Sequence, residues 1–283
     1  MATNFSSLMS GPTGNNLMIV DSMNLAFRWK HQGRLEFKEE YLRTVESLAK
    51  SYDCSKVLIA ADFGSSTYRK AIYPEYKQNR KDKADQQTPE EKEAFEKFFE
   101  EYERTLNFMN KYPVLRYKGV EADDIAAYIV KNSKNYNVNH IWLISSDKDW
   151  DCLISNKVSR FSYVTRKEIT VENWPYDVTQ ENYVSWKALV GDPGDNIAGI
   201  PGIGPKRASS LIAEYGSALD LYDACPIVSK YKHIQALNEN ANKILLNLNL
   251  MDLLTFCDEA IGSENVNSMN HMVREYLAHA DFD

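Results

Sequence analysis

The chain has 283 residues, 43% hydrophobic and 26% charged, which is enough for one large domain or two smaller ones with a real core. No apolar run approaches the roughly 18 residues of a membrane span, and four scattered cysteines without a Cys-x-x-Cys pair indicate a reduced, cytoplasmic protein. The net charge of −7 does not exclude a nucleic-acid ligand. Nine acidic residues are candidate metal ligands, and without their nine negative charges the rest of the chain would not be acidic.

The first sixteen residues are rich in Ser, Gly and Asn and lack the apolar region of a signal peptide, which predicts a flexible tail. Three apolar runs follow, at residues 17–20, 56–61 and 140–146. Runs that are apolar at consecutive positions are typical of strands buried on both faces of a parallel sheet. Because helical patterns alternate with these runs, we expect an α/β fold with a central, mostly parallel sheet flanked by helices.

Each of these three predicted strands ends at an aspartate, namely Asp21, Asp62 and Asp147. One strand-end aspartate is more often a turn or capping residue, but three at corresponding ends are harder to explain in that way. Ligands of open α/β sheets bind beyond the carboxyl ends of the strands. Without cations, carboxylates buried there together would repel one another and raise their pKa values.

Further acidic residues occur in three short motifs, and each motif alone is weak support for a metal site. Acids such as Glu121, Asp123 and Asp124 at the start of a helix are favoured by the helix dipole in any protein. Together with the strand-end aspartates they predict an oxygen-rich site of the kind that Mg²⁺ or Mn²⁺ prefers, and no His or Cys cluster competes for zinc. The nine candidate ligands are Asp21, Asp62, Glu121, Asp123, Asp124, Asp147, Asp149, Asp192 and Asp195.

Residues 191–208 place a phosphate-binding signal directly after the last two of these aspartates. Pro201-Gly-Ile-Gly204 is typical of a tight hairpin, and Pro205 occupies a favoured first position of a helix. The cations Lys206 and Arg207 follow at once. The free N–H groups at such a helix start suit a phosphate.

Between residues 64 and 83 the charge balance is basic, with tyrosines interleaved among the cations. Mixed cations and aromatics suit a single nucleic-acid strand, although a solvated charged face would give the same pattern. Lys77 and Arg80 are three residues apart and would share a helix face. A capping box at Thr88–Glu91 then begins a helix with an acidic outer face that we do not assign to DNA contact.

After probable strands at residues 158–163 and 168–171, the pattern is helical, with helices expected at 181–190, 207–215 and 244–254. We therefore expect a nuclease-like α/β core over residues 17–178, with a large insertion at about 76–113. A C-terminal helical region over residues 179–283 should pack directly on the sheet.

The motifs of this chain resemble those of the 5′-nuclease, or flap endonuclease, family. Gly191-Asp-x-x-Asp-Asn-Ile with Gly-Ile-Pro-Gly-Ile-Gly-x-Lys-Arg resembles the family signature. Other segments look like further family motifs in the same order, and the likeness runs from about residue 17 to at least 215. These segments are Tyr68-Arg69, Pro74-Glu-Tyr-Lys77 with Arg80, Val120-Glu-Ala-Asp-Asp124 and Ser146-Asp-Lys-Asp149.

With no polymerase segment, the chain is most similar to the stand-alone phage 5′–3′ exonucleases, which are related to the 5′-nuclease domain of bacterial DNA polymerase I. The resemblance implies a PIN-like core and a two-metal nuclease that hydrolyses phosphodiesters near single-strand/duplex junctions in DNA replication or repair. Four of the acids would surround one ion: Asp21, Asp62, Glu121 and Asp123. Asp149, Asp192 and Asp195 would surround the second ion, with Asp147 near both and Asp124 in the same acidic network.

The resemblance also implies that the insertion is a helical arch through which a 5′ single strand threads. Lys77 and Arg80 match positions that contact the scissile phosphate, so they join Asp147 and Asp149 as expected catalytic residues. A helix-hairpin-helix at about residues 183–215, with K⁺ in some relatives, would hold the duplex. The expected DNA contacts are Arg69, Lys70, Tyr76, Lys81, Lys83, Lys187, Gly202, Gly204, Lys206 and Arg207. Gln78 departs from the small residue usual in relatives after the Tyr-Lys pair.

We expect a monomer whose substrate is branched or nicked DNA with a 5′ flap. Two alternatives stay open at this point: a nuclease of RNase H type that removes RNA primers from RNA–DNA, and a non-catalytic helix-hairpin-helix DNA-binding protein. The second alternative gives no reason for nine carboxylates whose crowding without metal is costly.

Overall fold

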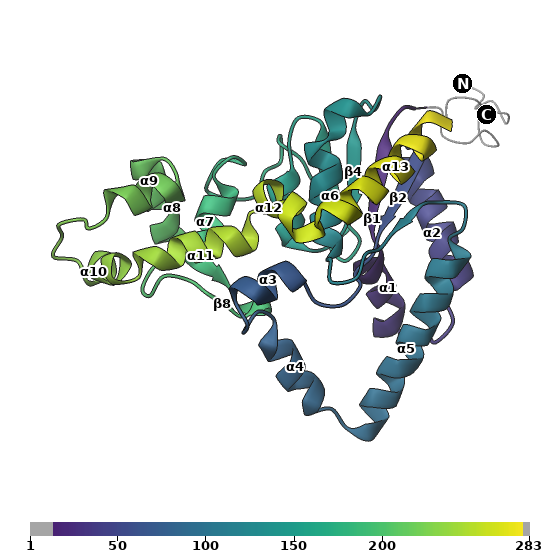
Figure 1. Cartoon of the computed structure of the whole chain (residues 1–283), viewed down its shortest axis with the longest axis horizontal. Coiled ribbons are helices and arrows are strands. Elements are labelled where there is room, and N and C mark those ends of the chain that lie inside the picture. Colours follow the sequence, from purple (N-terminus) through teal and green to yellow (C-terminus); the bar gives the residue numbers. More distant parts are fainter. Residues whose placement is uncertain (1–13, 280–283) are drawn as a thin grey trace.

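The structure, a computed structural model, describes residues 14–279, and its centre is a six-stranded sheet (Figure 1). The strand order is β3-β2-β1-β4-β5-β6, and every neighbouring pair is parallel except β5 and β6. The mostly parallel sheet predicted from the apolar runs is confirmed. In chain order the strands are β1 (Leu17–Asp21), β2 (Lys56–Ala60), β3 (Val114–Leu115), β4 (Ile141–Ile144), β5 (Val158–Ser162) and β6 (Lys167–Ile169).

Helices cover both faces of this sheet, which explains why its central strands are apolar at consecutive positions. On one face, Met18 and Ile59 pack against α1 (Ser22–His31), α2 (Lys38–Ser51) and α5 (Pro89–Phe108). On the other face, Ile19 and Leu58 pack against α6 (Ala122–Lys131), α12 (Leu253–Ile261) and α13 (Ser263–His279). The sheet is therefore the middle layer of three.

Two helices of the predicted insertion, α4 (Gln78–Asp85) and α5, enclose an open triangle below the body of the molecule (Figure 1). The predicted capping box begins α5, because Thr88 Oγ1 accepts from the Glu91 amide and Glu91 Oε2 accepts from the Thr88 amide. Short α3 (Thr67–Ile72) precedes α4. Buried Phe98 and Tyr102 hold the second half of α5 against the sheet layer, so α5 is an extension of the core helix packing.

The C-terminal helices form their own apolar core around Leu189, Ile203, Ile212 and Leu237. Their elements are α7 (Tyr183–Val190), β7 (Gly191–Asp192), β8 (Ile197–Ala198), α8 (Pro205–Tyr215), α9 (Ala218–Ala224), α10 (Lys232–Glu239) and α11 (Ala241–Met251). Helices α12 and α13 then return to the sheet. This arrangement confirms the predicted fold class, whereas the domain boundaries stay predictions.

Two local predictions are corrected by the structure. The single helix expected over residues 244–254 is broken at Asp252, whose carboxylate caps the next helix by accepting from the Thr255 amide at 3.0 Å. Of the predicted tail, residues 1–13 lie outside the described residues. In residues 14–16, the Gly14 amide donates to Asp53 and the Asn16 side chain donates to the Tyr52 carbonyl. These three residues are therefore held to the folded core, although the sequence assigns them to the tail.

Among residues 14–279, no helix combines the length and the apolar character needed to cross a membrane.

Candidate active site

The three strand-end aspartates lie at one edge of the sheet, because β1 pairs in register with both β2 and β4. Asp21 is buried at the end of β1, where it accepts from Ser145 Oγ at 2.7 Å and from the Asn24 amide. Asp62 accepts from the Ala122 amide at 2.8 Å. Burial, together with the charges of Asp62 and Asp147, raises the pKa of Asp21 to about 8. The mutual repulsion expected from the sequence is therefore present.

The acids at the start of α6 do not share one environment. Glu121 accepts from Tyr76 Oη at 2.9 Å and pairs with Lys77 Nζ at 2.8 Å. Burial opposes ionisation of Glu121, but the charges of Lys77 and Arg69 outweigh it and hold the pKa below its ordinary value. Asp123 accepts from the indole of Trp150 at 2.6 Å, and burial and Asp147 raise its pKa. Despite these different partners, Glu121 and Asp123 both lie beside the strand-end aspartates.

Asp124 and Arg69 form a buried pair, which corrects two predictions. Both terminal nitrogens of Arg69 lie 2.7 Å from the two oxygens of Asp124, and Arg69 Nε donates to the Leu250 carbonyl. Arg69 is 2% exposed and Asp124 is fully buried. Arg69 therefore cannot contact DNA, and Asp124 is engaged by a guanidinium rather than exposed to a metal. The pair joins α3, α6 and α11.

Lys187 is also placed differently from the prediction. It lies on α7, almost buried, with its ammonium group paired to Asp149 and, at 3.1 Å, to Asp192. Burial lowers the pKa of Lys187, but the two carboxylates outweigh it and raise the pKa above its ordinary value. The charge of Lys187 is thus directed at the acidic site, and its grip on duplex phosphates stays a prediction.

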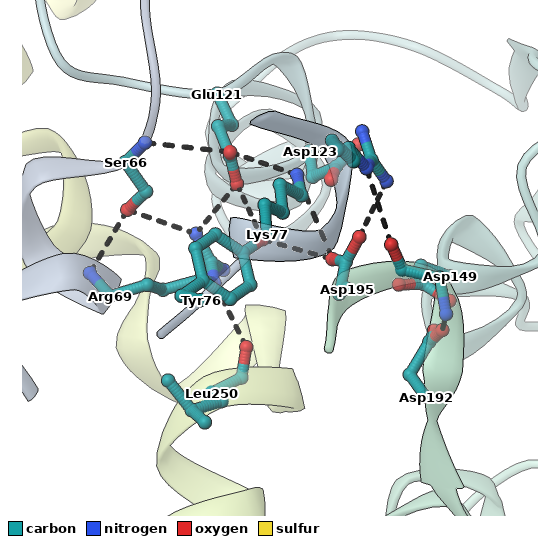
Figure 2. Close-up of polar contacts among 12 residues, drawn as sticks. Ser66, Arg69, Tyr76, Lys77, Glu121, Asp123, Asp149, Asp192, Asp195 and Leu250 are labelled. Carbon is teal, nitrogen blue, oxygen red and sulfur yellow. Dashed lines mark hydrogen bonds and ion pairs between the residues drawn. The ribbon is translucent and has the colours of Figure 1, made fainter. Parts of the chain in front are cut away.

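Lys77 and Arg80, the predicted phosphate contacts, reach the same acidic site from the base of the arch. Figure 2 shows Lys77 between Glu121 and Asp195. Lys77 Nζ lies between Glu121 and Asp195, at 2.8 and 3.6 Å, and Arg80 Nη2 lies 2.5 Å from Asp195. Tyr76 Oη donates to both of these acids at 2.9 and 3.0 Å. Tyr76 is 2% exposed, so it positions carboxylates and the predicted DNA contact is corrected.

The start of α4 is fixed to the short 3₁₀ helix η4 (Pro193–Asp195) by several hydrogen bonds. The Lys77 amide donates to the Asp195 carbonyl at 2.9 Å, and Asn79 Nδ2 donates to the Pro193 carbonyl at 2.8 Å. Lys77 has a φ of 56°, a left-handed conformation that is uncommon outside glycine. These hydrogen bonds join the start of the arch and the acidic loop into one unit, although Gln78 departs from the family pattern.

The chemistry of this donor set fits a hard divalent cation, since every candidate ligand is a carboxylate. Within residues 14–279, however, no three acidic, imidazole or thiol groups are spaced to hold one ion. Lys77 lies between one pair of carboxylates and Lys187 between another. A divalent ion would compete with these ammonium groups for the same oxygens.

The helix-hairpin-helix residues lie away from the acids, on an exposed surface. Gly204 caps α8, Pro205 is its first residue, and Gly202 has a φ of 76° that only glycine adopts readily. Arg207 Nη1 donates to the Gly202 carbonyl at 2.6 Å, and Lys206 is exposed beside it. The exposed α4 residues Lys81 and Lys83, with half-buried Lys70 on α3, are also free of the acidic site.

Two positioning residues were not predicted from the sequence. Ser145 donates to Asp21 and accepts from the Asp147 amide, and Trp150 donates to Asp123. Ser145 and Trp150 flank the Ser146-Asp-Lys-Asp149 motif, and this position next to the motif is the signal in the sequence that could identify them. Adjacency alone, however, does not show which carboxylate a neighbour contacts.

Comparison with known proteins identifies the family. The family model for the 5′–3′ exonuclease N-terminal resolvase-like domain matches residues 16–183, and that for the 5′–3′ exonuclease C-terminal SAM fold matches residues 178–271. The chain belongs to the 5′–3′ exonuclease family. The resemblance inferred from the motifs is confirmed.

Individual relatives agree with this assignment. The flap endonuclease of Escherichia phage T5 is 42% identical over 271 residues, which cover 94% of this chain and 93% of the relative. DNA polymerase I of Mycobacterium tuberculosis is 33% identical over 84% of this chain, which spans only 27% of that polymerase. A crystal structure of the T5 flap endonuclease, as a pseudo-enzyme-product complex with DNA and metal ions, superposes with a TM-score of 0.88, 42% identity and coverage of 93% and 99%.

Proposed function

We propose that this chain is a structure-specific, metal-dependent 5′ nuclease that acts as a flap endonuclease and 5′–3′ exonuclease. The observation that carries the proposal is that Lys77 and Arg80 of the arch pair with Glu121 and Asp195, beside the edge of the sheet at which Asp21, Asp62 and Asp147 lie. Acids alone would suit a structural cation. Acids with two phosphate-seeking cations beside them suit hydrolysis of a phosphodiester.

Two Mg²⁺ or Mn²⁺ ions are the cofactors that we propose, supported by the metal ions in the related T5 structure. Asp21, Asp62, Glu121 and Asp123 would hold one ion. Asp149, Asp192 and Asp195 would hold the other, with Asp147 near both. When bound, such ions supply an activated water, orient the phosphodiester and neutralise the leaving oxygen.

The protein's own residues prepare the phosphate site. Ser145 and Tyr76 hold Asp21, Glu121 and Asp195 in fixed orientations by donating hydrogen bonds to them. Arg80 is 58% exposed in its side chain, so its guanidinium can turn from Asp195 to a phosphate. Lys77 is fixed at the arch base and would stabilise charge on the phosphate that is cut. These cations would act without reading bases.

The substrate that we propose is branched or nicked DNA with a 5′ single-stranded flap. Gly202, Gly204, Lys206 and Arg207 would hold duplex phosphates, with K⁺ bound at the hairpin, and Lys70, Lys81 and Lys83 would contact the single strand near the arch. Contacts to phosphates fix register and carry no sequence information, so DNA structure is recognised. We also propose a monomer in the cytoplasm of a host cell, by analogy with the T5 relative.

A cleavage assay tests this function. Labelled 5′-flap, nicked-duplex and RNA–DNA substrates are incubated with Mg²⁺ or with EDTA. We expect Mg²⁺-dependent release of the flap near the junction, with a 5′-phosphate on the product, and loss of cleavage in Asp147→Asn plus Asp192→Asn. Binding without cleavage, unaffected by these substitutions, would leave only a DNA-binding protein; cleavage of the RNA strand alone would favour a ribonuclease.

A further inference from the structure

Away from the acids, three arginines and a tyrosine gather around a pocket of about 290 Å³ between α1, α2 and the β5–β6 turn. We call this group the arginine cluster: Arg28, Arg43, Tyr163 and Arg166. The hydroxyl residues Thr44 and Ser47 also line the pocket. No role of the cluster follows from the nuclease motifs.

Within residues 14–279, none of the three arginines forms an ion pair. Glu40 also lines the pocket, but Arg34 binds both of its oxygens at 2.5 and 2.6 Å. Arg28 and Arg166 lie over the Tyr163 ring, with guanidinium carbons 4.3 and 4.2 Å from its centroid. The charge of Arg43 also acts on Glu40, but three guanidinium groups beside one carboxylate that Arg34 already pairs are a local surplus of positive charge in a chain of net charge −7.

The cluster is connected to the acidic site through two elements. Helix α1 begins at the cap Asp21, and Arg28 follows seven residues later, about 10 Å along the helix. The β5–β6 turn is tied to the same edge of the sheet, because Ser146 Oγ accepts from the Val164 amide and the Ser146 amide donates to Asn24. Arg28 of the arginine cluster therefore lies about 10 Å along α1 from Asp21, one of the acidic residues.

Helix α1 also contacts the arch. Lys30 Nζ lies 3.0 Å from the centroid of the Phe95 ring on α5, and Phe27 stacks on Phe98 of the same helix. In Figure 1, α1 lies at the top of the opening between α4 and α5, and α7–α11 lie on the other side of that opening. Helices α7–α11 and helix α1, which carries Arg28, thus lie on opposite sides of α4 (Figure 1).

We propose that the arginine cluster binds the phosphates of single-stranded DNA, namely the 5′ segment of the substrate beyond the acidic site. This proposal rests on the proposed nuclease function. Guanidinium groups bind phosphate oxygens through paired N–H donors, and their planes stack on bases, as cations beside aromatics do in proteins that bind single strands. The cluster would hold the flap on one side of the arch while the hairpin holds duplex on the other.

Affinity as a function of flap length tests this proposal. Binding is measured in EDTA by fluorescence anisotropy, on duplexes with a one-nucleotide flap or a flap of about 12 nucleotides. The variant is Arg28→Gln with Arg166→Asn; Asn suits position 166, where φ is 58°. Arg274→Gln is the matched control, because Arg274 is exposed on α13, on the other face of the sheet from α1 and α2.

We expect wild type and Arg274→Gln to bind the long flap about tenfold more tightly than the short one, and the double variant to lose this advantage. The slope of log affinity against log salt on the long flap should fall by about 1.4 in the double variant, since each lost single-strand phosphate contact accounts for about 0.7. Affinity for the one-nucleotide flap should not change.

Retention of the length advantage and of the salt slope by the double variant would overturn the proposal, as would an equal loss in Arg274→Gln. Arg43→Gln, an exposed change on α2 that leaves the Tyr163 contacts intact, gives an independent result if the double variant unfolds. A partial loss of the length advantage in Arg43→Gln supports the proposal, and no loss contradicts it. Normal cleavage of the short flap by these variants keeps the nuclease proposal intact, so the two proposals fail separately.

Discussion

Lys77 combines an unusual backbone, a buried ammonium and two acidic neighbours. Burial lowers its pKa, but Glu121 and Asp195 outweigh burial and raise the pKa above its ordinary value, so Lys77 remains charged at neutral pH. Only 14% of its side chain is exposed. A permanent charge held in one place is what stabilisation of a developing phosphate charge requires.

Lys77→Ala should therefore reduce kcat on a 5′ flap by about 10²- to 10³-fold, with Kd changed by less than about threefold. Single-turnover cleavage and anisotropy binding measure the two quantities separately. Lys97→Ala is the matched control, because Lys97 is paired with Glu93 on the outer acidic face of α5. Equal losses in rate and in binding would remove Lys77 from the chemistry.

Asp21 should make the stability of the metal-free protein fall as the pH rises towards 8. Its pKa in the folded protein, about 8, lies above the ordinary value of 3.8, so between these pH values the folded state holds a proton that the unfolded state has lost. The free energy of unfolding must then fall as pH rises from about 4 to about 8.

In EDTA, Asp21→Asn should therefore gain on the order of 2–4 kcal/mol relative to wild type between pH 5 and pH 8, since one pKa unit is worth about 1.4 kcal/mol. The carbonyl oxygen of asparagine keeps the helix cap, whereas its amide nitrogen replaces the oxygen that accepts from Ser145; this loss does not depend on pH, so the pH-dependent difference remains readable. Urea unfolding at both pH values gives the difference, with exposed Asp177→Asn as the control. A difference independent of pH would show that Asp21 is ionised in the folded protein throughout.

At the scale of elements, the Arg69–Asp124 pair connects three helices that are distant in sequence. Arg69 belongs to α3 and Asp124 to α6, and the Leu250 carbonyl that accepts from Arg69 is in α11. A buried pair contributes little compared with apolar residues, but an unpaired partner is costly. The pair should therefore matter for stability rather than for DNA binding.

Arg69→Met should lower the free energy of unfolding by about 3–5 kcal/mol, because Asp124 is left buried without its partner. Adding Asp124→Leu should recover much of this loss, which urea unfolding of the single and double variants would show. Unchanged stability together with weakened DNA binding in Arg69→Met would contradict this role and support the DNA contact predicted from the sequence.

The sequence predicts elements where the pattern is local. Consecutive apolar residues identify β1, β2 and β4, and the Thr88 capping box identifies the start of α5. Helix α1 is not predicted, because its ten residues mix Asn, Arg and Lys with the apolar positions. The break at Asp252 is missed because apolar residues continue on both sides of the cap.

For the site, motifs identify the acids and the arch cations but not their partners. Because Arg69 and Lys187 are cations close to the nuclease motifs, the sequence predicts that they contact DNA. Their real partners, Asp124 and Asp149, are 55 and 38 residues away, and no local rule connects such pairs. Which cation stays free for phosphate is decided by packing, which buries Arg69 and Lys187 and leaves Arg80 exposed.

For the whole molecule, the base of the arch is the point at which its functions meet. Residues 191–208 begin with acids that η4 fixes against Lys77, Asn79 and Arg80 of the arch, and end in the hairpin that caps α8. A short, hydrogen-bonded span between the acidic site and the duplex-facing hairpin should set the position of the cut relative to the junction.

Mapping of the cut on a 5′-flap duplex and on a matched 3′-flap duplex, both with Mg²⁺, tests this account most directly. The account predicts that the 5′ flap is released by cleavage at or within about one nucleotide of the junction, whatever its sequence, and that the 3′ flap remains intact. Equal cleavage of both flaps, or cuts scattered along the single strand without reference to the junction, would contradict it.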